Sequence, residues 1–364
     1  MLIEQIDKNF LSENSIEFEN MNFFDVAEKP FKVHGGFVAN EENVKFRRLP
    51  ADISKEISKE LDWLSTCNVG ERISFRTNSK KISVICELTG YGRTNRDTLL
   101  NSAGIAVHIA EKNKNYAFKC AVCPTFENVM DEINGKEAKY GATVNISDGD
   151  FVDVMLYLPT ISVIKNLEIG IEKNATVEQS KNYRYVKPIV FYGSSITMGC
   201  CASRPSNIYP AMVSRQLDSE FINLGFSGNA LGETSVANYI ADLDMSAFVY
   251  DYDHNAPNVE HLKNTHEKFF KIIREKNPDL PIIMLTKPDH RDATDTALRA
   301  DVVWQTYYNA KNNGDDKVWL INGANIFDFD YYDDCLCDGT HPNDLGYMKM
   351  AEKVSAVIKP LLVR

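Results

Sequence analysis

Three side chains could together activate a hydroxyl group: Ser195, Asp338 and His341. Ser195 lies in "PIVFYGSSITMGCC" (residues 188–201), where an apolar run ends in a glycine and two serines. A serine hydroxyl is a poor nucleophile until an imidazole can take its proton, and the imidazole needs an acceptor that fixes its tautomer. Asp338 stands three residues before His341 in "CDGTHPND", so one turn of loop can join them. These residue types point to acyl transfer through a serine.

Acyl transfer also needs hydrogen-bond donors for the negative charge that develops on the carbonyl oxygen. The candidates are the backbone amides of Ser195 and Gly228 and the side-chain amide of Asn255. Gly228 lies in "GFSGNA" and Asn255 in "DYDHNAP". Near His341, Pro342 favours an extended backbone. We expect Asn343 or Asp344 to cap the helix that follows.

The C-terminal half contains the elements that must position these groups. Strands are predicted at "PIVFYG", "FINLGF", "AFVYDY", "PIIMLT" and "KVWLIN", with amphipathic helices between them. Such alternation predicts a parallel sheet covered by helices on both faces. The loops at the carboxyl ends of parallel strands gather at one edge, so the four polar segments are expected to meet there.

The N-terminal half contains short runs in which apolar and polar residues alternate, a pattern that predicts strands. They are "RISFRT", "ISVICEL", "GIAVHIA", "YAFKCAV", "FVDVMLYLP" and "LEIGIE". We expect an all-β sandwich of the jelly-roll type here. The change of rhythm near "SKNYRYVK" predicts two domains, residues 1–185 and 186–364.

The segments "GSSI", "NLGFSGN", "DYDHNAP" and "DGTH" resemble the four sequence blocks of the SGNH (GDSL-type) hydrolases. The resemblance covers the C-terminal half and implies a flavodoxin-like parallel sheet. The form "VYDYDHNAPNVEHL" is similar to a subgroup that has an N-terminal β-sandwich and is related to carbohydrate esterases and some acyltransferases. The resemblance implies a Ser195, His341 and Asp338 triad, with an oxyanion hole formed by Ser195, Gly228 and Asn255.

The sequence departs from the family pattern in three places. Ser194 stands where the family has Asp, Ile196 stands where it has Leu, and the third block keeps only Asn255 of its usual Gly-x-Asn-Asp. The α/β-hydrolase fold is the alternative for a serine triad, but it expects G-x-S-x-G, and Thr197 replaces the second glycine.

Composition limits the partners. The chain of 364 residues carries a formal charge of -11, which argues against nucleic acid or an anionic membrane as partner. No apolar run is long enough to span a bilayer, and the N-terminus does not read as a secretory signal. The eight cysteines then suggest reduced thiols and a cytoplasmic location. Cys120 and Cys123 form C-x-x-C without a second pair at zinc-site spacing. We expect no metal and no cofactor, and homo-oligomer formation is left open.

Three further residues are candidates for a role near the site. His254 adjoins Asn255, His290 follows the fourth predicted strand, and Arg204 follows the serine loop as a substrate contact or a structural partner. His266 lies on the apolar face of its helix and is expected in the core.

The residues thus predict a serine esterase. The resemblance implies that it hydrolyses short acyl esters on carbohydrate, with O-acetyl esters as the preferred substrate. An acyltransferase that uses the same triad and a non-catalytic carbohydrate-binding protein are the alternatives.

Overall fold

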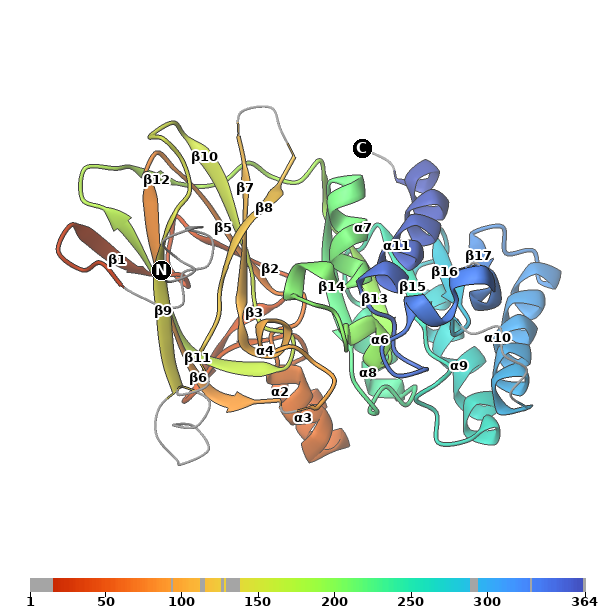
Figure 1. Ribbon diagram of the computed structural model, residues 1–364. Coiled ribbons are helices and arrows are strands. Elements are labelled where there is room, and N and C mark those ends of the chain that lie inside the picture. Colours follow the sequence, from red (N-terminus) through yellow and green to blue (C-terminus); the bar gives the residue numbers. More distant parts are fainter. Residues whose placement is uncertain are drawn as a thin grey trace.

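The computed structural model describes residues 16–92, 94–111, 115–125, 128, 138–288, 294–327 and 329–362. The N-terminal strands form one side of the molecule, and a helix-covered sheet forms the other (Figure 1). Within the described ranges, none of the helices combines the length and the apolar character needed to cross a bilayer.

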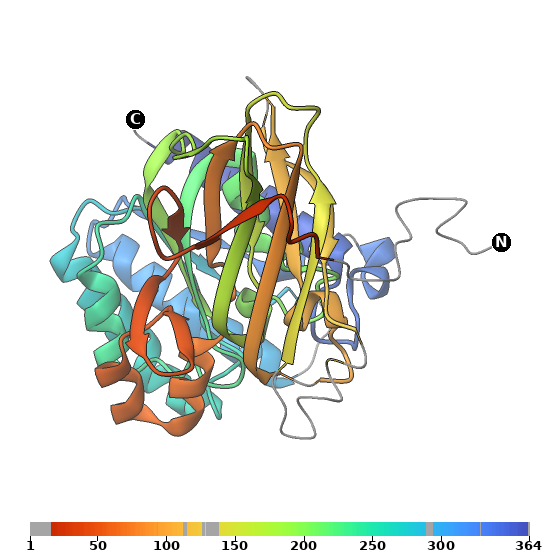
Figure 2. The ribbon, with the colours of Figure 1, turned by 90° about the vertical axis from the view of Figure 1, so that its left-hand side faces the viewer.

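Two antiparallel sheets make up most of the N-terminal half (Figure 2). The first contains, in spatial order, β1 (Met21–Asp25), β11 (Ser162–Glu172), β6 (Lys81–Tyr91) and β9 (Ala138–Asn145). The second contains β12 (Val177–Glu178), β5 (Arg72–Thr77), β10 (Val152–Tyr157), β7 (Ile105–Ala110) and β8 (Ala117–Val122), and β2 (Lys32–His34) also pairs with β5. Side chains from both sheets form one shared core, so the six predicted strands belong to a two-sheet sandwich.

Short helices interrupt this half where the sequence predicted only strands. They are α2 (Ala51–Ile57), α3 (Lys59–Thr66) and α4 (Leu99–Ala103), and a separate hairpin joins β3 (Phe37–Glu41) to β4 (Val44–Arg47). Local caps help to define two of them, because the side chains of Ser58 and Thr98 accept from backbone amides of α3 and α4. One or two turns carry too few apolar repeats to show helical periodicity in the sequence.

The C-terminal half is built on a five-stranded parallel sheet, as predicted. Its strands are β13 (Tyr185–Gly193), β14 (Ser219–Gly225), β15 (Ala247–Asp251), β16 (Ile282–Leu285) and β17 (Val318–Ile321). Their spatial order, β14-β13-β15-β16-β17, is the flavodoxin-like order, with the second strand at the edge. Every residue of β15 and β16 is buried, as expected for strands covered on both faces.

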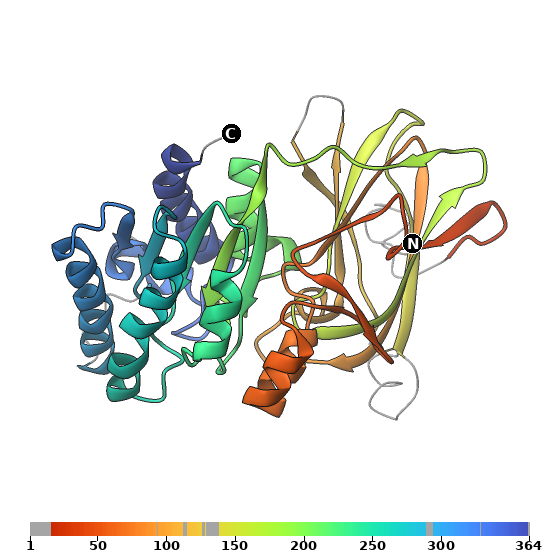
Figure 3. The ribbon, with the colours of Figure 1, turned by 180° about the vertical axis from the view of Figure 1, so that it is seen from behind.

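Helices cover both faces of this sheet (Figures 1 and 3). α7 (Tyr209–Leu217) packs on α11 (Asp344–Ile358), while α8 (Thr234–Ala241), α9 (Val259–Lys276) and α10 (Thr294–Asn312) pack in a row. The single-turn α6 (Ser195–Met198) follows β13 directly. Short 3-10 turns complete the described structure: η2 (Pro205–Asn207), η3 (Gly323–Asn325), η4 (Phe329–Tyr331), η5 (Asp333–Cys335) and η6 (Lys359–Leu361).

The edge strand β14 lies against the N-terminal half. Three alternate backbone carbonyls of this strand accept hydrogen bonds from two buried arginines of that half. Arg72 donates to the oxygen of Phe221 at 3.3 Å. Arg48 donates to the oxygens of Asn223 and Gly225 at 2.8 and 3.0 Å. The two halves are therefore joined through the backbone of an outer strand.

Candidate active site

Ser195 is the first residue of α6, immediately after the central strand β13. The sharp turn depends on Gly193, since a Cβ there would lie 2.2 Å from Thr197 Oγ1 and 2.4 Å from the Asp251 oxygen. The side chain of Ser194 caps the helix by accepting from the Ile196 amide at 3.1 Å. Ser195 is thus half-buried at the end of a rigid element.

The buried carboxyl group of Asp251 is hydrogen-bonded to α6. Asp251, the last residue of β15, accepts from Thr197 Oγ1 at 2.7 Å and from the Tyr209 hydroxyl at 3.0 Å. Burial raises the pKa of Asp251 to about 7, against the opposing effect of these two hydrogen bonds. The side chain of Asn223 donates to the Thr197 oxygen at 2.8 Å. Sequence reasoning overlooked Asp251, although it stands at the end of a predicted strand.

His341 lies between Ser195 and Asp338. Its Nε2 is 2.8 Å from Ser195 Oγ, and its Nδ1 is 2.9 and 3.1 Å from the two carboxylate oxygens of Asp338. The histidine side chain is 11% exposed and the aspartate side chain 21% exposed, so water has limited access to the pair. The structure therefore brings together the three groups that the sequence singled out.

The charge of Asp338 determines which way these hydrogen bonds run. Burial opposes its ionisation, but the His341 amide, the Arg96 guanidinium and the His341 ring outweigh that effect and hold its pKa below the usual range. An ionised carboxylate can only accept, so Nδ1 carries the proton and donates to it. Nε2 is then free to accept the Ser195 proton, which is the arrangement a general base requires.

Hydrogen bonds fix the loop that carries His341 on both sides of this residue. The Cys337 amide donates to the His341 oxygen at 2.8 Å, and Leu336 pairs with Pro342 in an isolated bridge. Asn343 caps α11 by accepting from two amides of its first turn at 3.0 and 3.2 Å, which confirms one of the two predicted caps. Asp344 instead accepts from the Ser203 amide at 2.8 Å, beyond the serine turn.

Gly228 and Asn255, the other predicted donors, lie in loops joined to the end of β13. The Phe226 amide donates to the Gly193 oxygen at 2.9 Å, and Asn255 Nδ2 donates to the Phe226 oxygen at 2.7 Å. Gly228 has a φ of +70°, in the left-handed region that favours glycine. The Asn255 amide has a second hydrogen, and the amide of Ser195, as the first of its helix, has no intrahelical acceptor.

Arg96 was not anticipated. This residue of the N-terminal half donates from Nη1 to Asp338 Oδ2 at 2.7 Å across 242 positions of sequence. Its segment, "GYGRTNRDTLLNSAG", shows turn residues and arginines, but nothing in it points to a partner so far along the chain.

The other candidates fall mostly outside the chemistry. His266 is buried as predicted, with Nδ1 2.8 Å from Thr306 Oγ1, and burial lowers its pKa to about 3. His254 Nδ1 lies 3.1 Å from Asp253 Oδ1. Arg204 stacks over the Phe118 ring at 4.0 Å, which favours its structural interpretation. His290 lies outside the described residues.

In the described part of the chain, one group of side chains has the donor atoms and the spacing to hold a metal ion. Cys201, Asp338 and His341 each offer one atom, and these atoms lie within 4.8 Å of one another. Two of the three already hydrogen-bond to each other, so this group overlaps the site itself. Cys120 and Cys123 are half-buried thiols that are not joined by a disulfide bond.

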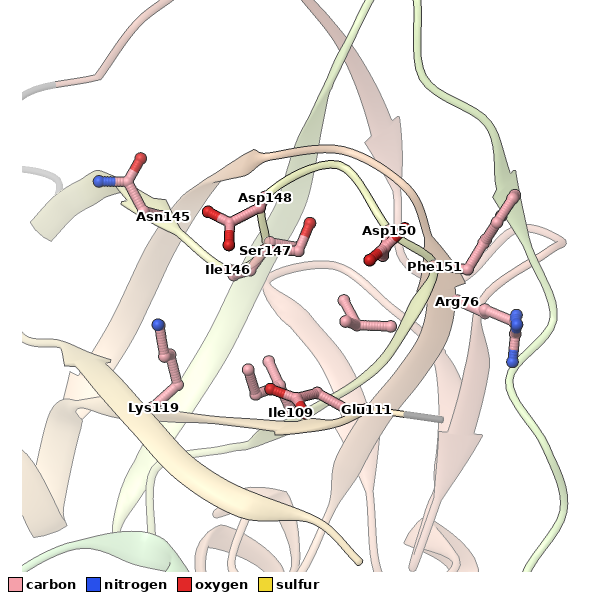
Figure 4. Close-up of a pocket in the computed structure, with 11 residues that line it drawn as sticks. Arg76, Ile109, Glu111, Lys119, Asn145, Ile146, Ser147, Asp148, Asp150 and Phe151 are labelled. Carbon is pink, nitrogen blue, oxygen red and sulfur yellow. The ribbon is translucent and has the colours of Figure 1, made fainter. Parts of the chain in front are cut away.

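A separate cavity of about 650 Å³ lies in the N-terminal half (Figure 4). Glu111 and Lys119 line it from the β7–β8 side, and Asp148 and Asp150 from the loop between β9 and β10. It adjoins the end of β7 at Ala110, whereas the other end of that strand follows α4 and the Arg96 segment. The cavity and the serine are therefore separated by at least the length of a strand.

Comparisons with known proteins agree with this architecture. Residues 186–359 match the family described as GDSL-like lipase/acylhydrolase, and residues 21–177 match the family described as the N-terminus of the SGNH-hydrolase type of esterase. A search of curated proteins found no significant match.

Several solved structures are similar along most of their length. A Bacteroides ovatus protein described as a GDSL-like lipase is 26% identical, with 94% of this chain and 98% of that chain covered and a TM-score of 0.81. A salicylyl-acyltransferase from a tetracycline biosynthetic pathway is 17% identical, with 96% and 100% covered and a TM-score of 0.74. A family two carbohydrate esterase from Clostridium thermocellum, solved with cellohexaose, is 14% identical, with 81% and 93% covered and a TM-score of 0.55. The last two are likenesses of fold.

Proposed function

The chain belongs to the SGNH (GDSL-type) hydrolase family, and from that premise we propose that it is a serine esterase that removes short acyl groups from carbohydrate hydroxyls. The observation that carries this proposal is the chain of contacts from Ser195 through His341 to Asp338. Ser195 Oγ lies 2.8 Å from His341 Nε2, and His341 Nδ1 lies 2.9 Å from Asp338 Oδ2. A binding protein has no need of a hydroxyl placed against a general base.

In the proposed reaction, Ser195 Oγ attacks the acyl carbonyl while His341 Nε2 takes its proton. The amides of Ser195 and Gly228 and the side chain of Asn255 donate to the oxyanion. His341 then gives the proton to the departing alcohol oxygen, which leaves an acyl ester on Ser195. A water molecule attacks this ester with His341 again as base, and the carboxylic acid is released. Asp338 stays ionised throughout and supports the imidazolium.

Two similar structures inform the proposed substrate. The similar Clostridium thermocellum protein is a carbohydrate esterase, and another from Butyrivibrio proteoclasticus, with a TM-score of 0.53, is an acetyl xylan esterase. These names support an O-acetyl ester of a sugar as the substrate here. The salicylyl-acyltransferase supports a second outcome, in which an alcohol acceptor replaces water.

The test compares the wild type with Ser195→Ala, using p-nitrophenyl acetate and then acetylated oligosaccharides. We expect Ser195→Ala to lower kcat by a factor of about 10³ or more, because the nucleophile is lost. Ser147→Ala, in the separate cavity, is the matched control and should keep full activity. Equal turnover by the wild type and Ser195→Ala would refute the proposal.

The same assay separates hydrolysis from transfer. Acetate release that matches alcohol release in the presence of added acceptor alcohols indicates an esterase. Acetylated acceptor in place of acetate indicates an acyltransferase.

We also propose that the chain divides near residue 185 and that its first domain is a jelly roll. The two matched families, over residues 21–177 and 186–359, support the division. The connections from β5 to β6, β6 to β7, β8 to β9, β9 to β10 and β10 to β11 each cross between the two sheets. Repeated crossing of this kind supports a double-sheet jelly roll over a simple meander.

A further inference from the structure

Among the described residues of the N-terminal half, the short segment 94–104 contacts both loops that carry the reacting groups. On this basis we propose that Arg96 is a positioning residue, through which the N-terminal domain orients the Asp338 carboxylate for His341. The inference rests on the proposed function, and it gives the N-terminal domain a part in the reaction.

Backbone amides and Arg96 hold different oxygens of the Asp338 carboxylate. Oδ1 of Asp338 accepts from the amides of Thr340 and His341 at 3.1 and 2.8 Å. Oδ2 is 2.9 Å from His341 Nδ1 and accepts from Arg96 Nη1 at 2.7 Å. The backbone amides therefore hold one oxygen, and Arg96 holds the oxygen that lies nearer the imidazole. Of these contacts, Asp338 Oδ2 would keep only the one to His341 Nδ1 if Arg96 were removed. The direction of that hydrogen bond would then lack the support of Arg96.

The segment that carries Arg96 is docked on the serine loop. Asp97 Oδ1 accepts from the Cys201 amide at 2.8 Å. Thr98 Oγ1 donates to the Ser203 oxygen at 2.8 Å, and Asn101 Nδ2 donates to the Gly199 oxygen at 3.2 Å. Because residues 199–203 directly follow α6, the segment that carries Arg96 is held against the turn that carries the serine. Arg96 thus links the acid to the nucleophile by a path separate from the sheet.

The exposure of Arg96 limits the strength of its contact with Asp338. The Arg96 side chain is 48% exposed, so solvent screens its attraction to Asp338. A charge-assisted hydrogen bond still fixes direction, and a planar guanidinium does so better than a lysine ammonium. We therefore expect loss of Arg96 to lower kcat about tenfold, with little change in KM, because Arg96 acts on the triad and not on the bound ester.

The experiment uses the full chain and measures kcat and KM for p-nitrophenyl acetate in Arg96→Ala, Arg96→Lys and the control Arg184→Ala, an exposed arginine outside the site. We expect about tenfold loss of kcat in Arg96→Ala, partial recovery in Arg96→Lys and no change in Arg184→Ala. Because Arg96 is half-exposed, low millimolar guanidinium chloride should restore part of the activity of Arg96→Ala, whereas equal sodium chloride should not. Unchanged kcat in Arg96→Ala, or a loss expressed only in KM, would overturn the proposal.

A second measurement separates this inference from the proposed function. The downfield proton NMR signal of His341 Nδ1–H reports the hydrogen bond to Asp338 whether or not an ester is cleaved. We expect this signal to shift or broaden in Arg96→Ala and to stay in place in Arg184→Ala. An inactive wild type with this change would refute the esterase and keep the positioning contact, and an active wild type without it would refute the contact alone.

Discussion

Arg48 and Arg96 both reach from the N-terminal half to the C-terminal half, but they meet different surroundings. Arg48 is 1% exposed and donates only to backbone oxygens, those of Leu64, Cys67, Asn223 and Gly225. Burial lowers its pKa to about 10. Arg96 is 48% exposed and pairs with one carboxylate. Arg48 therefore forms a buried contact between the two halves, whereas Arg96 forms a contact that solvent can reach.

This difference separates stability from activity. A buried guanidinium that satisfies several carbonyls cannot be removed without leaving buried acceptors unpaired, and each such loss is costly. A half-exposed ion pair contributes little to stability, but it can still set the orientation of a reacting group. We expect substitutions at the two arginines to affect different measurements.

The largest effect on stability is expected for Arg48→Met. This substitution keeps the apolar part of the side chain but leaves buried backbone carbonyls of both halves without a hydrogen-bond donor. The free energy of unfolding should therefore fall by about 3 kcal/mol or more. Urea unfolding followed by tryptophan fluorescence measures the change. Arg96→Met is the matched control and should lose less than about 1 kcal/mol. Similar losses in both variants would contradict the distinction.

A smaller, pH-dependent effect is expected at Glu220, which pairs with Arg72 and His34 in the buried join. Burial opposes its ionisation, but Arg72, His34 and the Phe221 amide outweigh it and lower the pKa of Glu220 from 4.5 to about 2. A depressed pKa stabilises the folded state above pH 4.5, and this contribution, roughly 3 kcal/mol, is lost as the pH falls toward 2.

Glu220→Gln should therefore be less stable than the wild type at pH 7, and the gap should narrow as the pH falls from 4.5 to 2. Unfolding free energies at a series of pH values test this expectation. A gap that stays constant across this range would show that Glu220 does not titrate with the fold.

The smallest effect concerns the Arg96–Asp338 pair. A double-mutant cycle with Arg96→Gln and Asp338→Asn should give a coupling free energy for folding below about 1 kcal/mol. The coupling should shrink further in 1 M salt, where the Debye length is about 3 Å. A large coupling that salt does not change would place this pair with the buried contacts.

The sequence was sufficient to predict the strands, which have a regular apolar pattern, and the polar residues that directly follow a strand. The five parallel strands were visible as apolar runs, and Asp338 and His341 were close in sequence, so their proximity to each other needed little knowledge of the fold. Ser195 required the further step that parallel strand ends share an edge. The distances agree with that reasoning, while the assignment of chemical roles stays a proposal.

Contacts between distant segments left no such signal. Arg48 and Arg72 donate to carbonyls of β14, and a backbone acceptor has no sequence identity to recognise. Arg96 and Asp338 are complementary in charge, but the chain has 40 basic and 51 acidic residues from which to choose pairs. The helices α2 and α3 were missed for a different reason, since they are too short for periodicity to appear.

The row of carbonyls along β14 has a consequence for any attempt to shorten the protein. An outer strand with unpaired backbone groups is a template on which another chain can add a strand. Arg48 and Arg72 occupy that template in the intact molecule. A fragment of residues 186–364 would expose it, and we expect such a fragment to self-associate along this edge before it could serve as a minimal catalyst.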